Sequence, residues 1–250
     1  FKFKNWLKRP FRAPHHTAST VALVGGGNPP VPGEISLAHQ GVLFLDELPE
    51  FTRAVLEALR EPIEAGVVAI SRAGHQVIFP ARFQLVAAMN PCPCGYYGDD
   101  RGQCSCSRTQ IVNYLHKISG PLLDRIDMHL TVHRMSASLL FNGGKSTNED
   151  SLTVRNRVCL VREMQKLRQG KVNAALNNDE LSCYCTLDNQ DQLFLAKAID
   201  LLGLSARAYH RILKLSRTLA DMDSSERIKR NHIQEAISYR KVSILNQFPD

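Results

Sequence analysis

An unbroken apolar run, Val42 to Leu45, follows Gly41 and ends directly in two carboxylates, Asp46 and Glu47. A continuous run of this kind is typical of a strand that is buried on both faces, and such strands belong mainly to parallel sheets covered by helices. The end of the run would bring both acidic side chains to one edge of the sheet. The pattern therefore predicts a buried parallel strand that leads into a functional site.

Strands and helices alternate over the first half of the chain. A second apolar run ends in Asn90, much as the first ends in Asp46. Apolar residues at helical spacing follow the first run until Gly66 interrupts them. This alternation predicts an α/β fold with a parallel sheet. Besides the first run, the predicted strands are 83–89 and 128–132, and the predicted helices are 55–63 and 109–118.

Two segments have the composition of β-hairpins or irregular insertions. Val67 to Ile70 and Gln76 to Phe79 are β-prone and flank a turn that includes Arg72 and His75, so the predicted hairpin has a basic tip. The first 40 residues are rich in Pro, Gly and His and predict an irregular or hairpin insertion.

The pattern changes at a polar linker, beyond which it is helical throughout. Asp188 and Ser205 are suited to cap the N-termini of helices, and Gly203 is suited to end one. We therefore expect an α/β domain before the linker and an all-α domain after it. The expected bounds are 1–135 for the α/β domain, 136–150 for the linker and 151–250 for the all-α domain, with helices near 151–169, 188–202, 205–222 and 231–240.

Four of the seven cysteines lie close together in a turn-rich segment, 92–106. Cys92 and Cys94 form one pair, and Cys104 and Cys106 form another. Four thiolates in such a loop suit a tetrahedral Zn²⁺ ion, which would order the segment. The alternative is a flexible loop with four reduced cysteines. An odd number of cysteines argues against a framework of disulfides.

Charge and hydropathy limit the environments in which we expect the chain to act. The 31 Lys and Arg against 24 Asp and Glu give a net charge of +7 and a pI of 9.1. This surplus permits a polyanionic partner without requiring one. The apolar runs are far shorter than the ~20 residues of a membrane span, and the basic residues at the start of the chain precede no apolar signal segment. We therefore expect a cytoplasmic protein without a membrane partner.

The acidic residues at the end of the first strand suit phosphate chemistry. Asp46 could hold Mg²⁺, and Glu47 could polarise a water molecule for attack on a γ-phosphate, which is the Walker B pattern. Asn90, at the end of the next strand, could orient that water. The alternatives are that the carboxylates simply emerge into solvent and that Asn90 belongs to a turn.

Two arginines are candidates for binding phosphate. Arg125 lies between Asp124 and Asp127, where it could form a local ion pair or act as an arginine finger toward a neighbouring subunit. Arg207 falls in the first turn of a predicted helix, a position that the helix dipole disfavours for a cation. An anionic ligand would explain that placement, although exposed arginines are also frequent in first turns.

One apparent phosphate-binding motif is misleading. Gly144-Lys145-Ser146 resembles the end of a P-loop, but Leu139 occupies the position of the required earlier glycine. No strand precedes the segment in the predicted pattern. We therefore interpret it as part of the linker, and this sequence contains no P-loop of its own.

Five segments together carry a resemblance to a known family: 11–19, 32–39, 41–51, 80–83 and 120–127. They resemble the magnesium-chelatase-like AAA+ ATPases of the ComM/YifB type, and the resemblance covers essentially the whole chain. It implies an AAA+ parallel-sheet core with β-hairpin insertions, followed by an all-α lid domain. In that family the P-loop precedes the Arg-Ala-Pro-His-His segment. The sequence thus resembles the C-terminal portion of a longer protein, beginning after the P-loop.

The resemblance also implies roles for single residues and for the assembly. Members of the family have been connected with DNA branch migration during natural transformation, as hexameric rings that use ATP and Mg²⁺. The hairpin that carries Arg72 and His75 would then project into the ring pore and contact the DNA backbone. By matching position, the resemblance implies Walker B for Asp46 and Glu47, sensor 1 for Asn90, the arginine finger for Arg125 and sensor 2 for Arg207.

Three functions are compatible with these observations. The first is an ATP-driven ring motor on DNA that resembles a branch-migration helicase. The second is the ATPase subunit of a magnesium chelatase, which remodels a partner protein. The third is a non-catalytic, zinc-dependent module for DNA binding or assembly, because the chain has no P-loop of its own. The basic charge and the cysteine segment weakly favour DNA.

Overall fold

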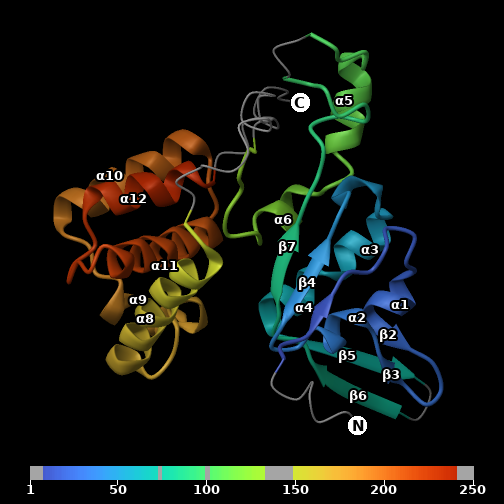
Figure 1. The fold of residues 1–250 in the computed structure, drawn as a ribbon, viewed down its shortest axis with the longest axis horizontal. Helices are drawn as coiled ribbons and strands as arrows, with labels where there is room; N and C mark the ends of the chain where they lie inside the picture. Colours follow the sequence, from blue (N-terminus) through green and yellow to red (C-terminus); the bar gives the residue numbers. More distant parts are fainter. Residues whose placement is uncertain (1–7, 73–74, 99–101, 133–148, 241–250) are drawn as a thin grey trace. The chain divides into compact units, whose positions relative to one another are not determined.

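The computed structural model describes residues 8–72, 75–98, 102–132 and 149–240. The described residues divide into two compact units, one that ends at Ile126 and one that begins at Asp127 (Figure 1). Among the described residues, no helix is long and apolar enough to cross a membrane.

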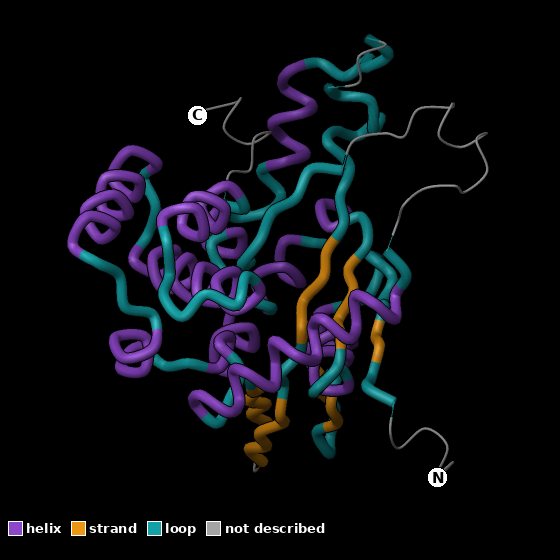
Figure 2. The backbone as a smooth tube through the Cα atoms, turned by 60° about the vertical axis from the view of Figure 1, so that its left-hand side comes forward, coloured by secondary structure: helices purple, strands orange, loops and turns teal. Residues whose placement is uncertain are grey.

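The first unit is built on a small parallel sheet. It comprises β1 (Phe11–Arg12), β4 (Val42–Leu45) and β7 (Gln84–Ala87), in the order β1-β4-β7 (Figure 2). Leu43 and Leu45 on the central strand are fully buried, whereas Val42 and Phe44 are half-buried, so the predicted burial is complete on only one face of the strand. Strand β1 was not predicted, because a pair of residues is too short to show a periodic pattern.

Helices cover this sheet and complete its core. The single helix predicted from the apolar spacing is in fact two, which meet at Leu59. Gly66 ends the second of them in the left-handed conformation, as expected, and Phe51 and Leu56 are buried between these elements and the sheet. The helical elements are α1 (Thr20–Val24), α2 (Glu34–Leu37), η2 (Leu48–Glu50), α3 (Arg53–Ala58), α4 (Arg60–Ala65), α5 (Arg108–Leu115) and α6 (Gly120–Leu123).

Two hairpins belong to the same unit. The antiparallel pair β5 (Val67–Arg72) and β6 (His75–Pro80) confirms the predicted hairpin, and its last described pair is Arg72 with His75. A shorter antiparallel pair, β2 (Gly25–Gly26) and β3 (Val31–Pro32), lies in the expected N-terminal insertion. At Gly33 an added Cβ would lie 2.4 Å from the Gly25 nitrogen, so close backbone packing requires a glycine there.

The third predicted strand, Met128 to Val132, is wrong. This segment belongs to the second unit, where the His129 backbone N–H donates to the Tyr239 carbonyl after a helix. Leu130 and Val132 are 69% and 90% exposed. A β-prone segment forms a strand only if another strand completes its hydrogen-bond ladder. The described part of the second unit contains helices and no strand that could complete the ladder of this segment.

The second unit is all-helical where it is described. Asp188 and Ser205 cap helices through their side chains, and Gly203 ends a helix in the left-handed conformation, so all three predictions are confirmed. Helix α9 was not predicted. The helices are α8 (Ser151–Gln169), η3 (Asn173–Ala175), α9 (Asn178–Tyr184), α10 (Asn189–Leu202), α11 (Ala206–Met222) and α12 (Arg230–Ser238).

A buried charge network fixes α11 within the second unit. The Asp221 carboxylate is 1% exposed and accepts hydrogen bonds from Arg168, Arg217 and Asn173. Burial acts to raise the pKa of Asp221, but the hydrogen bonds from Arg168 and Asn173 and the charge of Arg217 outweigh it, so this pKa is lowered. The Asp221 carboxylate therefore stays ionised inside the unit and ties α8, η3 and α11 together.

Candidate functional site

The carboxyl ends of β4 and β7 bring the predicted acidic residues and the predicted asparagine to the same edge of the sheet. The Ala88 backbone N–H donates to the Leu45 carbonyl, and the Leu48 N–H donates back to the Ala88 carbonyl. These bonds continue the contact between the two chain segments beyond the strands themselves. Asp46 and Glu47 follow one strand, and the exposed Asn90 follows the other, as expected for parallel strands that lead to a site.

Glu47 has an unusual backbone conformation for a residue with a side chain. Its φ of 52° and ψ of 46° lie in the left-handed region. The Asp46 carboxylate accepts a hydrogen bond from the Glu47 N–H at 2.9 Å, and the Glu47 carbonyl accepts one from Glu50 at 2.7 Å. These contacts hold the turn. Strained positions of this kind occur preferentially at functional sites.

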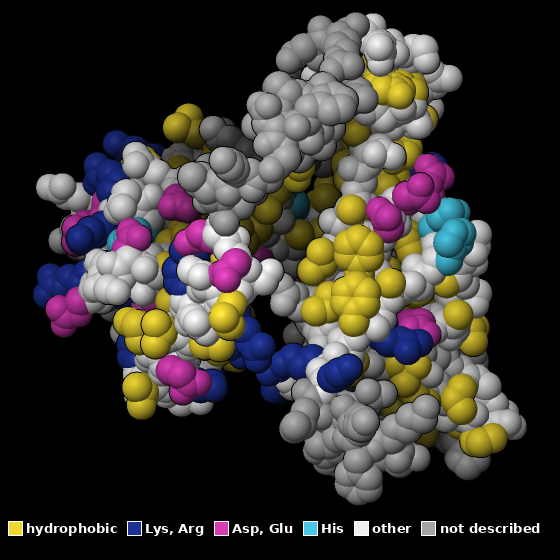
Figure 3. All heavy atoms as spheres, viewed as in Figure 1, with side chains coloured by type: hydrophobic (Ala, Val, Ile, Leu, Met, Phe, Trp, Pro, Cys, Tyr) yellow, Lys and Arg dark blue, Asp and Glu magenta, His cyan; other side chains and the backbone are white. Residues whose placement is uncertain are grey.

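A histidine that the sequence analysis did not assign contacts Glu47. The Nδ1 atom of His16 lies 3.1 Å from Oε2 of Glu47. His16 belongs to the segment that follows β1, so the sheet brings it beside the end of the neighbouring strand. Figure 3 shows histidine side chains in cyan beside acidic side chains in magenta on the surface. Only the pairing of β1 with β4, which sequence patterns did not predict, could have revealed this contact.

Tyr114 on α5 links the cysteine segment to Asn90. Burial, and after it the negative charge of Glu50, raises the pKa of Tyr114 to about 12, although the backbone of Asn90 lies close enough to the hydroxyl to act to lower it. Tyr114 therefore remains protonated and lies near both the acidic edge of the sheet and the cysteines.

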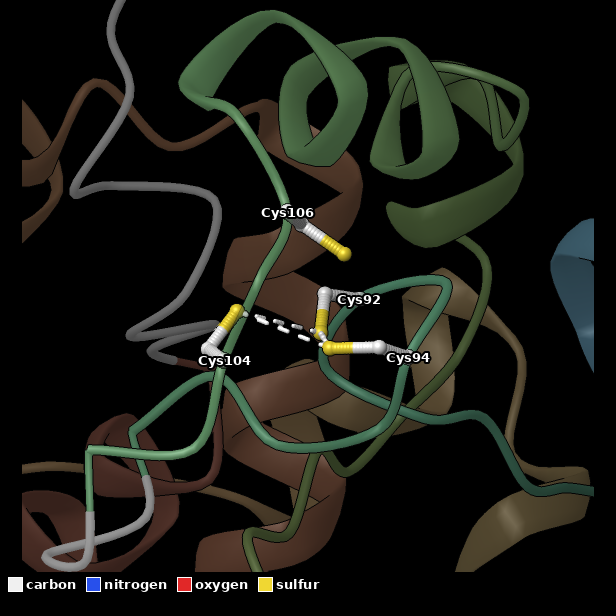
Figure 4. A group of neighbouring side chains, drawn as sticks. All are labelled: Cys92, Cys94, Cys104 and Cys106. Carbon is white, nitrogen blue, oxygen red and sulfur yellow. Dashed lines mark hydrogen bonds between the residues drawn. The ribbon is translucent and has the colours of Figure 1, made fainter.

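The four cysteines of the segment 92–106 converge, as the spacing of the two pairs suggested (Figure 4). Sγ of Cys92 lies 3.3 Å from that of Cys94 and 3.8 Å from that of Cys104, and all four sulfurs lie within 4.8 Å of one another. A tetrahedral zinc ion with Zn–S bonds of about 2.3 Å would hold its sulfurs about 3.8 Å apart. The cluster is therefore compatible with zinc.

The thiols of this cluster strongly influence one another's ionisation. A backbone hydrogen bond from Tyr96, helped by the thiol of Cys92, lowers the pKa of Cys94 to about 6. A backbone hydrogen bond from Cys94 favours the Cys106 thiolate, yet the neighbouring sulfurs and burial outweigh it and raise the pKa of Cys106 to about 12. One thiolate thus discourages further ionisation in the cluster. A divalent cation would remove that repulsion.

Arg125 is nearly buried and is paired within its own unit. Its Nη2 donates to Oε2 of Glu64 at 2.8 Å, and its Nη1 donates to the Pro121 carbonyl at 2.7 Å. The side chain is 8% exposed, and its buried Nε has no hydrogen-bond partner among the described residues. Arg125 thus forms an ion pair with Glu64, whereas Asp127 pairs with Arg211. A role as an arginine finger stays a prediction.

The structure describes the remaining predicted site residues only in part, or places them in the second unit. Arg207 is exposed in the first turn of α11, in the second unit. The backbones of Arg72 and His75 face each other at the end of the β5–β6 ladder, whereas their side chains lie outside the description. The sequence Gly144-Lys145-Ser146 also lies outside the described residues.

The parallel sheet with its acidic edge is consistent with an AAA+-like fold. Family comparison agrees: the sequence model of magnesium chelatase subunit ChlI matches residues 1–140, and the model of the C-terminal part of that subunit matches residues 148–240. The chain therefore belongs to the magnesium chelatase ChlI family, whose members are of the AAA+ ATPase type.

Within this family the chain is similar to bacterial proteins of the ComM and YifB type. It is 54% identical to competence protein ComM of Haemophilus influenzae, over 98% of this chain and 48% of that protein. It is 50% identical to YifB of Escherichia coli, over 97% of this chain and 47% of that protein. The chain thus spans about half the length of these relatives. A more distant relative is the maternal DNA replication licensing factor mcm6 of Xenopus tropicalis, 22% identical over 85% of this chain and 26% of that protein.

Proposed function

We propose that this chain is part of a ring-forming, ATP-driven DNA motor that resembles a branch-migration helicase of natural transformation. The observation that carries the proposal is the meeting of Asp46, Glu47 and Asn90 at one edge of a parallel sheet. The similarity to a competence protein and to a DNA replication licensing factor supports DNA as the partner. A hexameric ring of identical subunits is the assembly we propose.

In this proposal the chain contributes the residues that act on the γ-phosphate and its attacking water. Asp46 would hold Mg²⁺, Glu47 would accept hydrogen bonding from the water, and Asn90 would orient it. Arg125 would approach the nucleotide of a neighbouring subunit, and Arg207 would sense phosphate from the second unit. The P-loop would come from a part of a longer protein outside this sequence, because the ComM and YifB relatives are about twice as long.

The hairpin β5–β6 is the DNA contact that we propose. Arg72 and His75 occupy its last described register pair. Cationic contacts with the phosphate backbone are independent of sequence and weaken with salt, which suits a motor that must move along any DNA. We also propose that the cysteine cluster binds one Zn²⁺ ion, because the spacing of its sulfurs is compatible with tetrahedral coordination.

Two other functions remain as alternatives. The family match itself favours a motor that remodels a protein partner, like the ATPase subunit of magnesium chelatase. The convergence of the cysteines in a sequence without a P-loop favours a non-catalytic, zinc-dependent module for DNA binding or assembly. Neither alternative accounts for both the acidic edge of the sheet and the similarity to DNA-associated proteins.

The test uses the full-length protein that contains this chain. ATP hydrolysis is measured with and without branched DNA, together with branch migration of a four-way junction. Glu47→Gln should abolish turnover and leave ATP binding intact, whereas Glu50→Gln, a change at a nearby glutamate that pairs with Lys117, should retain turnover. Hydrolysis that is insensitive to DNA, with no branch migration, would reject the DNA motor in favour of a protein-remodelling ATPase.

A further inference from the structure

The side chain of Glu47 is half-exposed, although its backbone is fixed. The turn around it is held by hydrogen bonds with Asp46 and Glu50, while 52% of the side chain is accessible to solvent. A glutamate in this setting can sample several rotamers. A group that activates water has to hold a defined position, so the site needs a contact that restrains the carboxylate.

His16 supplies such a contact and is itself held in place. Its ring lies against that of His15, tilted by 35° with 4.1 Å between centroids, and it meets the edge of Phe51 at 6.5 Å. Phe51 is only 2% exposed and belongs to the core of the first unit. Nδ1 of His15 is in turn 3.0 Å from the hydroxyl of Thr17. The position of the His16 ring is therefore set by the fold.

The geometry leaves part of the Glu47 carboxylate available for chemistry. Nδ1 of His16 lies 3.1 Å from Oε2 of Glu47, so it faces only one of the two carboxylate oxygens. The other oxygen can still accept a hydrogen bond from water. An imidazole N–H at this distance orients the carboxylate without blocking it.

We propose that His16 is a positioning residue that holds the Glu47 carboxylate in place for water activation. The inference rests on the proposed ATPase function and deepens it. His16 acts through Glu47 and has no contact with the nucleotide in this proposal. The segment that connects β1 to α1 therefore takes part in the hydrolytic site.

The experiment compares substitutions at His16 in the full-length protein by steady-state ATP hydrolysis. His16→Ala should lower kcat about tenfold or more and leave KM for ATP nearly unchanged, because a misplaced carboxylate affects the chemical step rather than binding. His16→Asn should retain most of kcat, since its amide N–H can take the place of Nδ1. His16→Gln, which has a longer side chain, should lose kcat as Ala does. His210→Ala, in the second unit, is the control for loss of a histidine and should match the wild type.

The results separate this inference from the proposed function. If the wild type hydrolyses ATP and Glu47→Gln abolishes it, but His16→Ala and His16→Gln keep the wild-type kcat, the positioning role is wrong and the ATPase proposal stands. Equal losses with His16→Asn and His16→Gln would also overturn it. If the wild type hydrolyses no ATP, both proposals are wrong.

Discussion

Removing Glu64 should destabilise the first unit through Arg125. The two side chains form an ion pair at 2.8 Å, with Arg125 8% and Glu64 34% exposed. Loss of one partner from a fully buried pair costs about 3–5 kcal/mol, whereas an exposed pair contributes about 0–1 kcal/mol. The exposure of Glu64 lies between that of a fully buried and that of an exposed partner, and Arg125 keeps its hydrogen bond to the Pro121 carbonyl when Glu64 is removed. We therefore expect Glu64→Ala to lower the free energy of unfolding by about 2 kcal/mol.

The assay is urea unfolding of the chain, followed by circular dichroism, with Arg60→Ala as the matched control. Arg60 pairs with Glu57 in the same region, but the Arg60 side chain is 37% exposed, so its loss should cost less than about 1 kcal/mol. The reasoning is refuted if Glu64→Ala destabilises the chain no more than Arg60→Ala does. Such a result would mean that the Arg125 guanidinium gains little from this pairing and is readily released.

The same pair bears on the proposed arginine finger. To reach a nucleotide in a neighbouring subunit, Arg125 would have to leave Glu64 and the Pro121 carbonyl. Rings made of Arg125→Ala protomers should be inactive, and mixing them with Glu47→Gln protomers should restore part of the turnover. If mixed rings recover no turnover, Arg125 does not act on a neighbouring subunit. Its role would then be to stabilise its own unit through the ion pair with Glu64.

The remaining predictions concern metal, pH and DNA. Metal analysis of the purified chain should find one zinc ion per molecule, and Cys104→Ser should lower this content; a value near zero contradicts the zinc site. Because the pKa of Asp221 is lowered by folding, its contribution to stability is present above about pH 4 and is lost as the pH falls through the folded-state pKa. Asp221→Asn should remove this part of the acid sensitivity in unfolding experiments. Arg72→Ala should weaken DNA binding. It should also lower by about one the number of counterions released on binding, which is measured from the salt dependence of the affinity.

Local signals in the sequence were sufficient to predict several structural elements. The apolar run before Asp46 forms a buried parallel strand, and Asp188 and Ser205 cap helices as predicted. These features depend on residues only a few positions apart. Local signals failed at Met128 to Val132, where the described residues include no neighbouring strand that could complete a hydrogen-bond ladder.

Contacts between distant segments required the tertiary structure. The sequence placed carboxylates at a strand end and four cysteines in one short segment, because both patterns are local. It could not pair His16 with Glu47, or Arg125 with Glu64, since each contact depends on which strands and helices pack together. The sequence by itself therefore determined the chemical groups that the site offers. Only the pairing of β1 with β4, and the approach of Arg125 to Glu64 on α4, decided which partner holds each of them, because hydrogen bonds and ion pairs form only between groups that the fold brings within a few ångströms.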